Sequence, residues 1–338
     1  MAKGLKVIHI LRGFKMLDPQ AHGLIKLMME HGVPAVNTQT PDQARHAYRA
    51  RKAFSQPEPL EVGRVQDHEL DLGQQKLKIR EYRPIGWLDS TPFKEGPPRG
   101  GALLYFHGGG WTIGDLETHD VLCRALCAGA HCAVFSVDYR LAPEVPFPGA
   151  FDDALASFNW LTSCAQDPSF GIDPERIALA GDSAGGNLAA AACIALKEAP
   201  IRPCFQLLIY PATDMQCSFP SHVKNAKGFL LTSDAIEWFR ANYMPDPSTY
   251  ADWRASPLNA KSHEGLPPAC VVLAGFDPLH DEGLAYANLL SQSGVSVKVI
   301  NFERQIHGFI TMGRILDEAN TAVDLCVSIL KSALLKQP

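Results

Sequence analysis

The sequence contains no apolar run long enough to span a membrane. A spanning helix needs about 20 mostly apolar residues, and no stretch of the 338 residues provides them without interruption. Near the N-terminus, basic residues precede an apolar patch at 7–11 that includes a histidine. This patch is shorter than the apolar part of a signal peptide. We therefore expect neither a membrane span nor a secretion signal.

An excess of basic residues is also missing. Lys and Arg number 31 against 36 Asp and Glu, which gives a net charge of −5 at pH 7. Proteins that bind nucleic acid broadly carry basic patches or runs, and the basic residues here form no such run. We expect no nucleic-acid partner.

Paired cysteines with the spacing of a metal site are absent. The nine cysteines are an odd number and are scattered, with Cys123 and Cys127 inside a predicted helix. His263 and His280 have no second candidate ligand nearby, so we do not expect a zinc site. The pattern is typical of cysteines that act as small core residues in a reduced setting. We predict a cytoplasmic protein without a metal or cofactor.

The sequence does contain enough apolar residues for a large core, 46% of the total. Its length would allow two domains, but α/β folds often exceed about 250 residues around one core. Two strand patterns, Arg64–Leu70 and Lys76–Tyr82, flank a turn at 71–73 and predict an antiparallel hairpin. A loop rich in Pro and Gly follows at 84–101.

Short apolar strands then alternate with longer helical patterns. Continuous apolar strands between helices indicate a parallel sheet covered on both faces. Together with the hairpin, they predict an α/β fold with an eight-stranded, mostly parallel sheet flanked by helices. The further strands are expected at Ala102–Phe106, Cys132–Val137, Ile177–Ala180, Phe205–Tyr210, Cys270–Ala274 and Val295–Phe302, and the helices at Leu122–Gly129, Asp152–Leu161, Gly186–Lys197, Leu284–Gln292 and Glu318–Leu335.

Two segments, residues 1–55 and 213–267, fall outside this alternation. A strand-to-strand connection as long as the second segment usually holds a lid or binding element. We expect both segments to form a helical cap over a catalytic domain made of residues 56–212 and 268–338. The helices predicted in the cap are Pro19–Glu30, Pro41–Phe54 and Ser233–Tyr243.

One serine lies in a setting typical of a nucleophile. Residues 181–186 read Gly-Asp-Ser-Ala-Gly-Gly, between an apolar strand and a run of small helical residues. A tight turn at this place strains the serine backbone and lifts its hydroxyl above the sheet, while the flanking glycines leave room around it. Ser183 is therefore the candidate nucleophile, although three fixed positions alone also occur by chance.

A serine nucleophile needs a base to take its proton and an acid to orient that base. Asp277 directly follows the predicted strand at 270–274, and His307 follows the last predicted strand. Both lie at the carboxyl ends of parallel strands, where catalytic groups collect. We predict a triad of Ser183, Asp277 and His307. Asp281 is a rival acid, which we expect to support the loop instead.

The negative oxygen that forms during attack on a carbonyl needs N–H donors aimed at it in advance. His107 and three glycines follow the predicted strand at 102–106, and glycines let the backbone approach a substrate closely. We predict donors at Gly108, Gly109 and Ala184. His107 precedes these donors on the wrong side for proton transfer, so we expect it to orient the loop.

With these motifs the chain resembles the hormone-sensitive-lipase-like carboxylesterases of the α/β-hydrolase superfamily, over nearly its whole length. The resemblance implies an α/β-hydrolase fold with a cap and metal-free hydrolysis of short- to medium-chain acyl esters through an acyl-enzyme. It also implies a possible homodimer along a sheet edge. It rests on His-Gly-Gly-Gly-Trp at 107–111, Tyr-Arg-Leu-Ala-Pro-Glu at 139–144, the turn at 181–186, Asp-Pro-Leu at 277–279 with Asp-Glu at 281–282, and His-Gly-Phe at 307–309.

Other residues are assigned supporting roles. The segment of His107 and the three glycines, residues 107–110, is called the glycine loop. We expect Asp182 and Glu144 to hold the turn at Ser183 and the glycine loop. His119 fits either a ligand or a group that hydrogen-bonds at a helix start, and we favour the second. Several aromatic residues fit either the pocket wall or the core: Trp87, Trp111, Phe219, Trp238 and Phe239.

Three alternative functions stay open. A non-catalytic receptor of this fold would bind a small carboxylic acid, and receptors that resemble the family have lost the catalytic histidine, whereas His307 is present. Specialisation for amides or aryl esters is compatible with the same triad. A lipase that acts on insoluble triglyceride would need a large exposed apolar surface, which no part of the sequence indicates.

Overall fold

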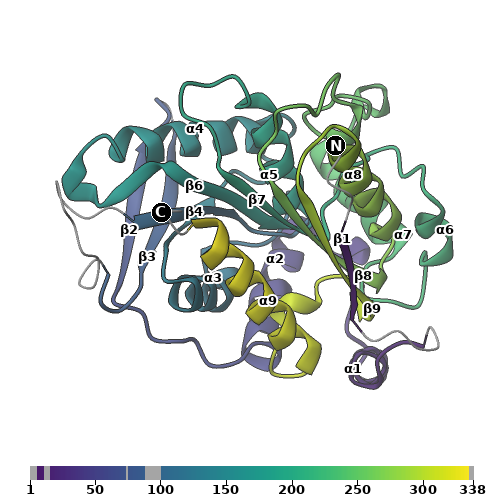
Figure 1. The fold of residues 1–338 in the computed structure, drawn as a ribbon. Helices are drawn as coiled ribbons and strands as arrows, with labels where there is room; N and C mark the ends of the chain where they lie inside the picture. The colour runs from purple at the N-terminus through teal and green to yellow at the C-terminus, as the bar shows by residue number, and fades with distance from the viewer. Residues whose placement is uncertain (1–5, 11–15, 74, 88–99, 335–338) are drawn as a thin grey trace.

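The fold is built on one sheet whose strands run through the middle of the molecule (Figure 1). The structure, a computed structural model, describes residues 6–10, 16–73, 75–87 and 100–334. Within these ranges the sheet has nine strands, in the order β1-β9-β8-β7-β6-β4-β5-β3-β2. They are β1 (Lys6–Ile10), β2 (Arg64–Asp71), β3 (Lys76–Arg83), β4 (Gly100–Phe106), β5 (Ala133–Asp138), β6 (Ile172–Asp182), β7 (Phe205–Ile209), β8 (Ala269–Phe276) and β9 (Val297–Ile306).

Most neighbouring strands are parallel. β2 and β3 form the predicted antiparallel hairpin, with Arg64 opposite Arg83, and β3 is also antiparallel to β5. The other six neighbouring pairs are parallel. The prediction of a mostly parallel sheet is therefore confirmed.

The described sheet has one strand more than the eight predicted. The extra strand is β1, which pairs in parallel with β9 and places Val7 opposite Val299. It lies at an edge, and Val7 and Ile8 are 38% and 46% exposed. A short edge strand buries little of its surface and lacks the continuous apolar pattern of a central strand. The prediction of residues 1–55 as purely helical was wrong at this point.

Helices cover both faces of the sheet. On one face α3 packs against α9, and the other face is covered by α4, α5 and α8 (Figure 1). None of the described helices combines the length and the apolar character that crossing a membrane requires. The α-helices in the described ranges are α1 (Pro19–Glu30), α2 (Pro41–Ser55), α3 (Leu116–Ala130), α4 (Gly149–Cys164), α5 (Ala184–Ala195), α6 (Pro220–Lys224), α7 (Ser233–Tyr243), α8 (His280–Gln292) and α9 (Asp317–Leu334).

Strand β4 shows why the central strands read as continuous apolar runs. Side chains alternate between the two faces of a strand. Leu104 and Phe106 join the apolar cluster that includes α4 and α5, while Leu103 and Tyr105 join the cluster that includes α3 and α9. All four side chains are fully buried. Because helices cover both faces, every position of the strand after Gly100 is buried.

Element boundaries differ from the predictions mainly at their starts. Helix α3 begins at Leu116 rather than Leu122, because the Asp115 carboxylate caps it by accepting the N–H of Thr118 at 2.8 Å. Helix α6 was not predicted. Several predicted segments lie partly outside the described residues, namely 1–5 and 11–15 of the cap, 88–99 of the loop at 84–101, and Leu335 at the end of the last helix.

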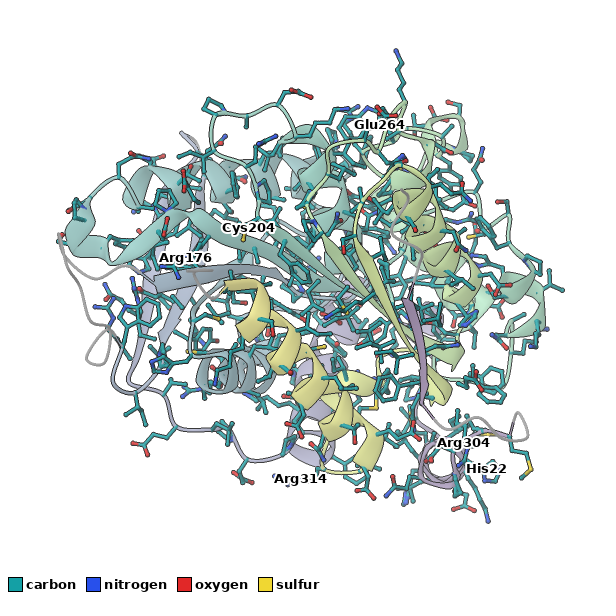
Figure 2. The ribbon with its side chains drawn as sticks, in the orientation of Figure 1. His22, Arg176, Cys204, Glu264, Arg304 and Arg314 are labelled. Carbon is teal, nitrogen blue, oxygen red and sulfur yellow. The ribbon has the colours of Figure 1, made fainter. Side chains whose placement is uncertain are left out.

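Helix α1 is attached to the carboxyl end of β9. Asp18 caps α1 by accepting the N–H of Gln20 at 2.8 Å, and its own N–H donates to the carbonyl of Arg304 at 2.9 Å. The guanidinium of Arg304 donates to the carbonyl of Met16 at 3.2 Å. Figure 2 shows Arg304 beside His22 of α1. The N-terminal helices are thus fixed near the edge where the parallel strands end.

Candidate active site

Ser183 lies in a strained turn between β6 and α5. Its φ and ψ are 56° and −116°, and a positive φ is uncommon for any residue other than glycine. The N–H of Ser183 donates to the carbonyl of Ile209, at the end of β7, at 2.8 Å. The turn is therefore fixed at the carboxyl end of the sheet, as predicted, with the serine side chain half-buried.

Glycine is required in this turn because the backbone packs directly against neighbouring backbone. A Cβ atom added to Gly185 would lie 1.9 Å from the carbonyl oxygen of Phe106, at the end of β4. A Cβ added to Gly181 would lie 2.3 Å from the carbonyl carbon of Gly185. Neither contact can be relieved by rotating a side chain, so the two glycines set the distance between the turn and the glycine loop that follows β4.

Replacing Gly185 by alanine is expected to destabilise the protein by about 3 kcal/mol, since the added methyl group forces two backbone segments apart. Urea unfolding of the two proteins measures the difference. Gly23→Ala is the matched control: a Cβ there meets nothing within 4 Å, and alanine in a helix interior stabilises by about 0.5–1 kcal/mol. A Gly185→Ala protein with the parent's unfolding midpoint would contradict the close contact.

The structure brings the three predicted triad residues together. Nε2 of His307 lies 2.8 Å from Oγ of Ser183, and Nδ1 of His307 lies 2.7 Å from Oδ2 of Asp277. These distances join a hydroxyl, an imidazole and a carboxylate in one line of hydrogen bonds. Such a line lets the imidazole take the serine proton while the carboxylate stabilises the charged ring.

Asp277 is held rigidly at the end of β8. Its side chain is fully buried, and its second oxygen, Oδ1, accepts the N–H of Leu279 at 2.8 Å. The amide of Asn225 donates to the carbonyl of Asp277 at 2.8 Å. On the other side of the imidazole, the ring of Tyr210 lies 4.6 Å from the ring of His307, centre to centre. The histidine is thus fixed by a hydrogen bond and by ring packing.

Asp281 does not contact His307. Its carboxylate accepts the N–H of Ser221 at 3.0 Å, and its own N–H donates to the Ser221 hydroxyl at 3.1 Å. The same hydroxyl donates to the carbonyl of Pro278 at 2.6 Å. Asp281 therefore ties the loop that carries Asp277 to helix α6, which is the supporting position expected for it.

The predicted donor at Gly108 needs correction. Its N–H donates to Oδ1 of Asp182 at 2.8 Å, so it is already used inside the protein. Gly109 and Gly110 instead line the same pocket as Ser183 and Ala184. Among the described residues, no acceptor is hydrogen-bonded to the N–H of Gly109 or Gly110. Of the three donors predicted from the sequence, Gly108 is thus bound to Asp182, while Gly109 and Ala184 line the pocket.

The glycine loop bends so sharply that side chains are excluded from it. Gly109 and Gly110 have φ of 121° and 55°. A Cβ on Gly109 would lie 2.1 Å from the carbonyl oxygen of Ile113, and one on Gly110 would lie 2.2 Å from the ring of Phe239. The loop closes with the N–H of Thr112 donating to the carbonyl of Gly109 at 3.0 Å. The backbone amides of this loop therefore lie beside the pocket without side chains between.

Asp182 connects the turn at Ser183 to the glycine loop. Besides the N–H of Gly108, its Oδ1 accepts the hydroxyl of Tyr105 at 2.7 Å and lies 3.2 Å from Nε2 of His119. Burial alone would raise the pKa of Asp182, but His119 and Tyr105 outweigh burial and lower it. The carboxylate is thus kept charged, and it holds both loops as predicted by position.

His107 is buried and uncharged. Its ring stacks on the ring of Tyr139 with centres 4.2 Å apart, and its Nδ1 lies 2.8 Å from the carbonyl oxygen of Gly108. Burial, helped by the nearby ring of His119, lowers the pKa of His107 to about 4. A neutral ring packed under the glycine loop supports that loop, which is the orienting position expected for His107.

Glu144 acts on the glycine loop through Arg45 of α2. The Glu144 carboxylate pairs with both terminal nitrogens of Arg45 in α2, at 2.6 and 2.9 Å. Nε of Arg45 donates to the carbonyl of Thr112 at 2.9 Å, and its Nη2 donates to the carbonyl of Ala142 at 2.9 Å. Arg45 therefore attaches helix α2 to the glycine loop, a contact that sequence patterns did not reveal.

The pocket above Ser183 has a volume of about 750 Å³. Its wall combines residues of α1 and α2, such as Leu24 and Tyr48, with residues of the 213–267 segment and with His307. Of the five aromatic residues considered from the sequence, Trp111 and Phe239 line the pocket. The other three are outside its described lining. The described residues contain no group of three or more His, Cys, Asp or Glu side chains that could hold a metal ion.

Comparison with known proteins reveals relatives that cover most of the chain. Residues 103–311 match the model of a protein family described as having an alpha/beta hydrolase fold. The carboxylic ester hydrolase LipN of Mycobacterium tuberculosis is 37% identical over 324 residues, which cover 94% of this chain and 83% of LipN. An ethyl acetate hydrolase of Pseudomonas putida is 38% identical over 303 residues, which cover 87% of this chain and 92% of that protein.

Solved structures of two esterases are also similar. An ester hydrolase from the metagenome of Lake Arreo, solved with a phosphonate derivative, superposes with a TM-score of 0.87 at 38% identity, covering 94% of this chain and 99% of that one. A hyperthermophilic esterase of the archaeon Pyrobaculum calidifontis superposes with a TM-score of 0.84 at 33% identity, covering 94% of this chain and 98% of that one.

Proposed function

The chain belongs to the hormone-sensitive-lipase-like part of the α/β-hydrolase family and is a carboxylic ester hydrolase, and from this premise we propose how its residues carry out the hydrolysis. The resemblance, the fold class and the ester hydrolase activity expected from the sequence are confirmed. For the residues that perform the hydrolysis, the strongest support is the pair of hydrogen-bond distances at His307, 2.8 Å to Ser183 and 2.7 Å to Asp277.

In the first half of the reaction, His307 takes the proton of the Ser183 hydroxyl as Oγ attacks the ester carbonyl. The Asp277 carboxylate stabilises the positive imidazole that results. His307 then gives the proton to the departing alcohol, and an acyl-enzyme is left on Ser183. In the second half, His307 takes a proton from water as the water attacks the acyl-enzyme. His307 then returns the proton to Oγ of Ser183 as the bond between Oγ and the acyl carbon breaks, and the carboxylic acid is released.

The negative oxygen formed in each half needs backbone donors. We propose the N–H groups of Gly109, Gly110 and Ala184, all of which line the pocket beside Ser183. Ala184 is also the first residue of α5, and the positive end of a helix dipole favours negative charge at that place. Each such donor typically contributes a few kcal/mol to lowering the barrier.

The substrates are proposed to be esters of short to medium acyl chains. Support comes from the cavity, whose wall combines Ser183 with residues of α1, α2 and the 213–267 segment, and from the ethyl acetate hydrolase among the relatives. We propose that residues 1–55 and 213–267 form this cap, because both contribute to the pocket wall, and that 56–212 and 268–338 form the catalytic domain.

A series of p-nitrophenyl esters tests the function. We expect hydrolysis of the acetate, butyrate and octanoate esters and little hydrolysis of the palmitate ester, because a cavity of about 750 Å³ has to hold the acyl chain together with the alcohol group. The release of p-nitrophenol measures the rates. No turnover of any ester would favour the receptor alternative, and activity that rises sharply above the substrate's solubility limit would favour a lipase.

Two further expectations are kept as proposals. We propose a reducing, cytoplasmic compartment, and it is supported by nine cysteines that all lie in the described residues without forming a disulfide. We also propose that any homodimer forms along a sheet edge. In the described part of the chain the edge strands are β1 and β2.

A further inference from the structure

A second cavity lies at the end of strand β3, away from the substrate pocket. Its volume is about 330 Å³. β3 is antiparallel to β5, and Tyr82 pairs with Val134 near the start of β5. The cavity therefore lies at the amino end of the parallel strands, whereas Ser183 lies at their carboxyl end. In Figure 1, β3 is at the left of the sheet, and α7, which lines the substrate pocket, is at the right.

The lining of this second cavity, which we call the arginine cavity, is cationic. In the described part of the chain it includes two arginines and no acidic residue. A cavity lined by charges of one sign focuses the electric field and attracts ions of the opposite sign. The lining residues are Gly63, Arg64, Arg83, Pro84, Gly86, Trp87, Ser169 and Phe170, and none of them lines the substrate pocket.

A single buried carboxylate, that of Glu81, binds both arginines. Its Oε1 accepts Nε–H of Arg83, and its Oε2 lies 2.8 Å from Nη2 of Arg64 and 2.9 Å from Nε2 of His68. Burial would raise the pKa of Glu81, but the charge of Arg83 and the hydrogen bonds from His68 and Arg83 outweigh burial and lower it. The carboxylate is therefore charged, and it balances only one of the two guanidinium charges.

Arg83 has a donor nitrogen that the protein leaves unused. Its side chain is only 5% exposed. Nε donates to Glu81, and Nη2 donates to the carbonyl of Phe170 at 2.9 Å. Nη1 is buried and has no hydrogen-bond partner among the described residues. Cζ of Arg83 lies 5.1 Å from the ring centre of Trp87 and 5.2 Å from that of Phe170, so aromatic rings fix the guanidinium. An unpaired donor on a buried cation is costly, and an anion in the cavity supplies the missing acceptor.

Trp87 adds a second unused donor to the same cavity. Its Nε1 is buried, and no described residue accepts its N–H. The indole packs directly against the start of β4, because a Cβ atom added to Gly100 would lie 2.1 Å from Cη2 of Trp87. Arg64, whose side chain is 52% exposed, lines the side of the cavity that is open to solvent. Two guanidinium groups and an indole N–H are donors only, so together they require an acceptor.

We propose that the arginine cavity binds a small inorganic oxyanion of the phosphate or sulfate type. The oxygens of the anion accept N–H groups from Arg64, from Nη1 of Arg83 and from Nε1 of Trp87. Guanidinium groups suit such an anion because they form charge-assisted hydrogen bonds to two oxygens at once. The anion also balances the second guanidinium charge. This binding does not rest on the proposed function, because the two cavities share no lining residue.

Inorganic phosphate is the probe, and isothermal titration calorimetry at low ionic strength measures its binding. We expect one phosphate per chain with a Kd below about 1 mM. Arg64→Gln should weaken binding at least about tenfold. Arg64 is replaced rather than Arg83 because the loss of a fully buried partner would disturb Glu81. Lys78→Gln is the matched control: it removes the same charge from an exposed position of β3, outside the cavity, and should change Kd by less than about twofold. A parent without binding at about 10 mM phosphate, or Arg64→Gln with the parent's affinity, would overturn the proposal.

The indole signals of the five tryptophans locate the anion in the parent protein. With isotopically labelled tryptophan, nuclear magnetic resonance resolves each indole N–H, and Trp87→Phe identifies the signal of Trp87 while keeping an aromatic ring beside Gly100. Phosphate should shift the Trp87 signal most, because an oxygen of the anion accepts this N–H. A larger shift at another indole, or an unchanged Trp87 signal at saturating phosphate, would show that the anion binds elsewhere and would refute the site.

Discussion

Replacing Ser183 by alanine is expected to lower kcat for p-nitrophenyl butyrate by at least about 10⁴-fold. The substitution removes only the hydroxyl, which lies 2.8 Å from Nε2 of His307. Alanine at a φ of 56° carries a backbone strain similar to that of serine, so the turn should keep its shape. Without Oγ no acyl-enzyme can form, and the backbone donors alone stabilise a direct attack by water only weakly.

The control for this prediction is a stability measurement beside the rate measurement. Equal urea midpoints for the parent and Ser183→Ala would show that the lost rate is chemical. The variant should also stay unlabelled by a fluorophosphonate that adds its phosphorus to one serine of the parent. An alanine variant with the parent's kcat would exclude Ser183 as the nucleophile.

The main features of the fold were predictable because helices cover both faces of the sheet. Strands such as β4, buried on both faces, appear in the sequence as short apolar runs, and the helices between them carry apolar stripes. Edge strand β1 gave no such signal, because Val7 and Ile8 are 38% and 46% exposed. What the sequence pattern detects is burial, so it misses a short edge strand whose described apolar side chains are partly exposed.

The meeting of the three proposed triad residues was predictable for a different reason. Ser183, Asp277 and His307 each follow a strand of one parallel sheet, and the carboxyl ends of such strands lie at one edge. The donors were harder to place. Gly108, Gly109 and Gly110 are identical in type, and the hydrogen bond from the N–H of Gly108 to Asp182 distinguishes Gly108 from the other two. That bond depends on how the turn at Ser183 packs against the loop, which no local pattern encodes.

Contacts across long sequence distances were out of reach of the sequence pattern. His119 was interpreted as a group that hydrogen-bonds at a helix start, and its Nδ1 does lie 3.0 Å from the Thr118 hydroxyl. Its other nitrogen meets Asp182, which is 63 positions away. Likewise, His222 and Glu282 are 60 positions apart and meet at the pocket wall. Such pairs follow from the packing of whole elements, so a single sequence does not reveal them.

Replacing Asp277 by asparagine is expected to lower kcat by about 10⁴-fold with little loss of stability. The Oδ1 atom accepts the N–H of Leu279 at 2.8 Å, so the asparagine oxygen should keep this position and its NH₂ group should face Nδ1 of His307. An NH₂ donor can meet Nδ1 only when that nitrogen is unprotonated. The ring proton then moves to Nε2, which faces Ser183 and can no longer take the serine proton.

Asp281→Asn is the matched control, because Asp281 is bound to Ser221 and His280 rather than to His307. Its kcat should stay close to that of the parent, and its urea midpoint measures the support that it gives to the loop. If Asp281→Asn lost kcat while Asp277→Asn kept it, the acid of the triad would be Asp281. A large loss in both variants at unchanged stability would mean that the loop position, rather than the tautomer of His307, limits the rate.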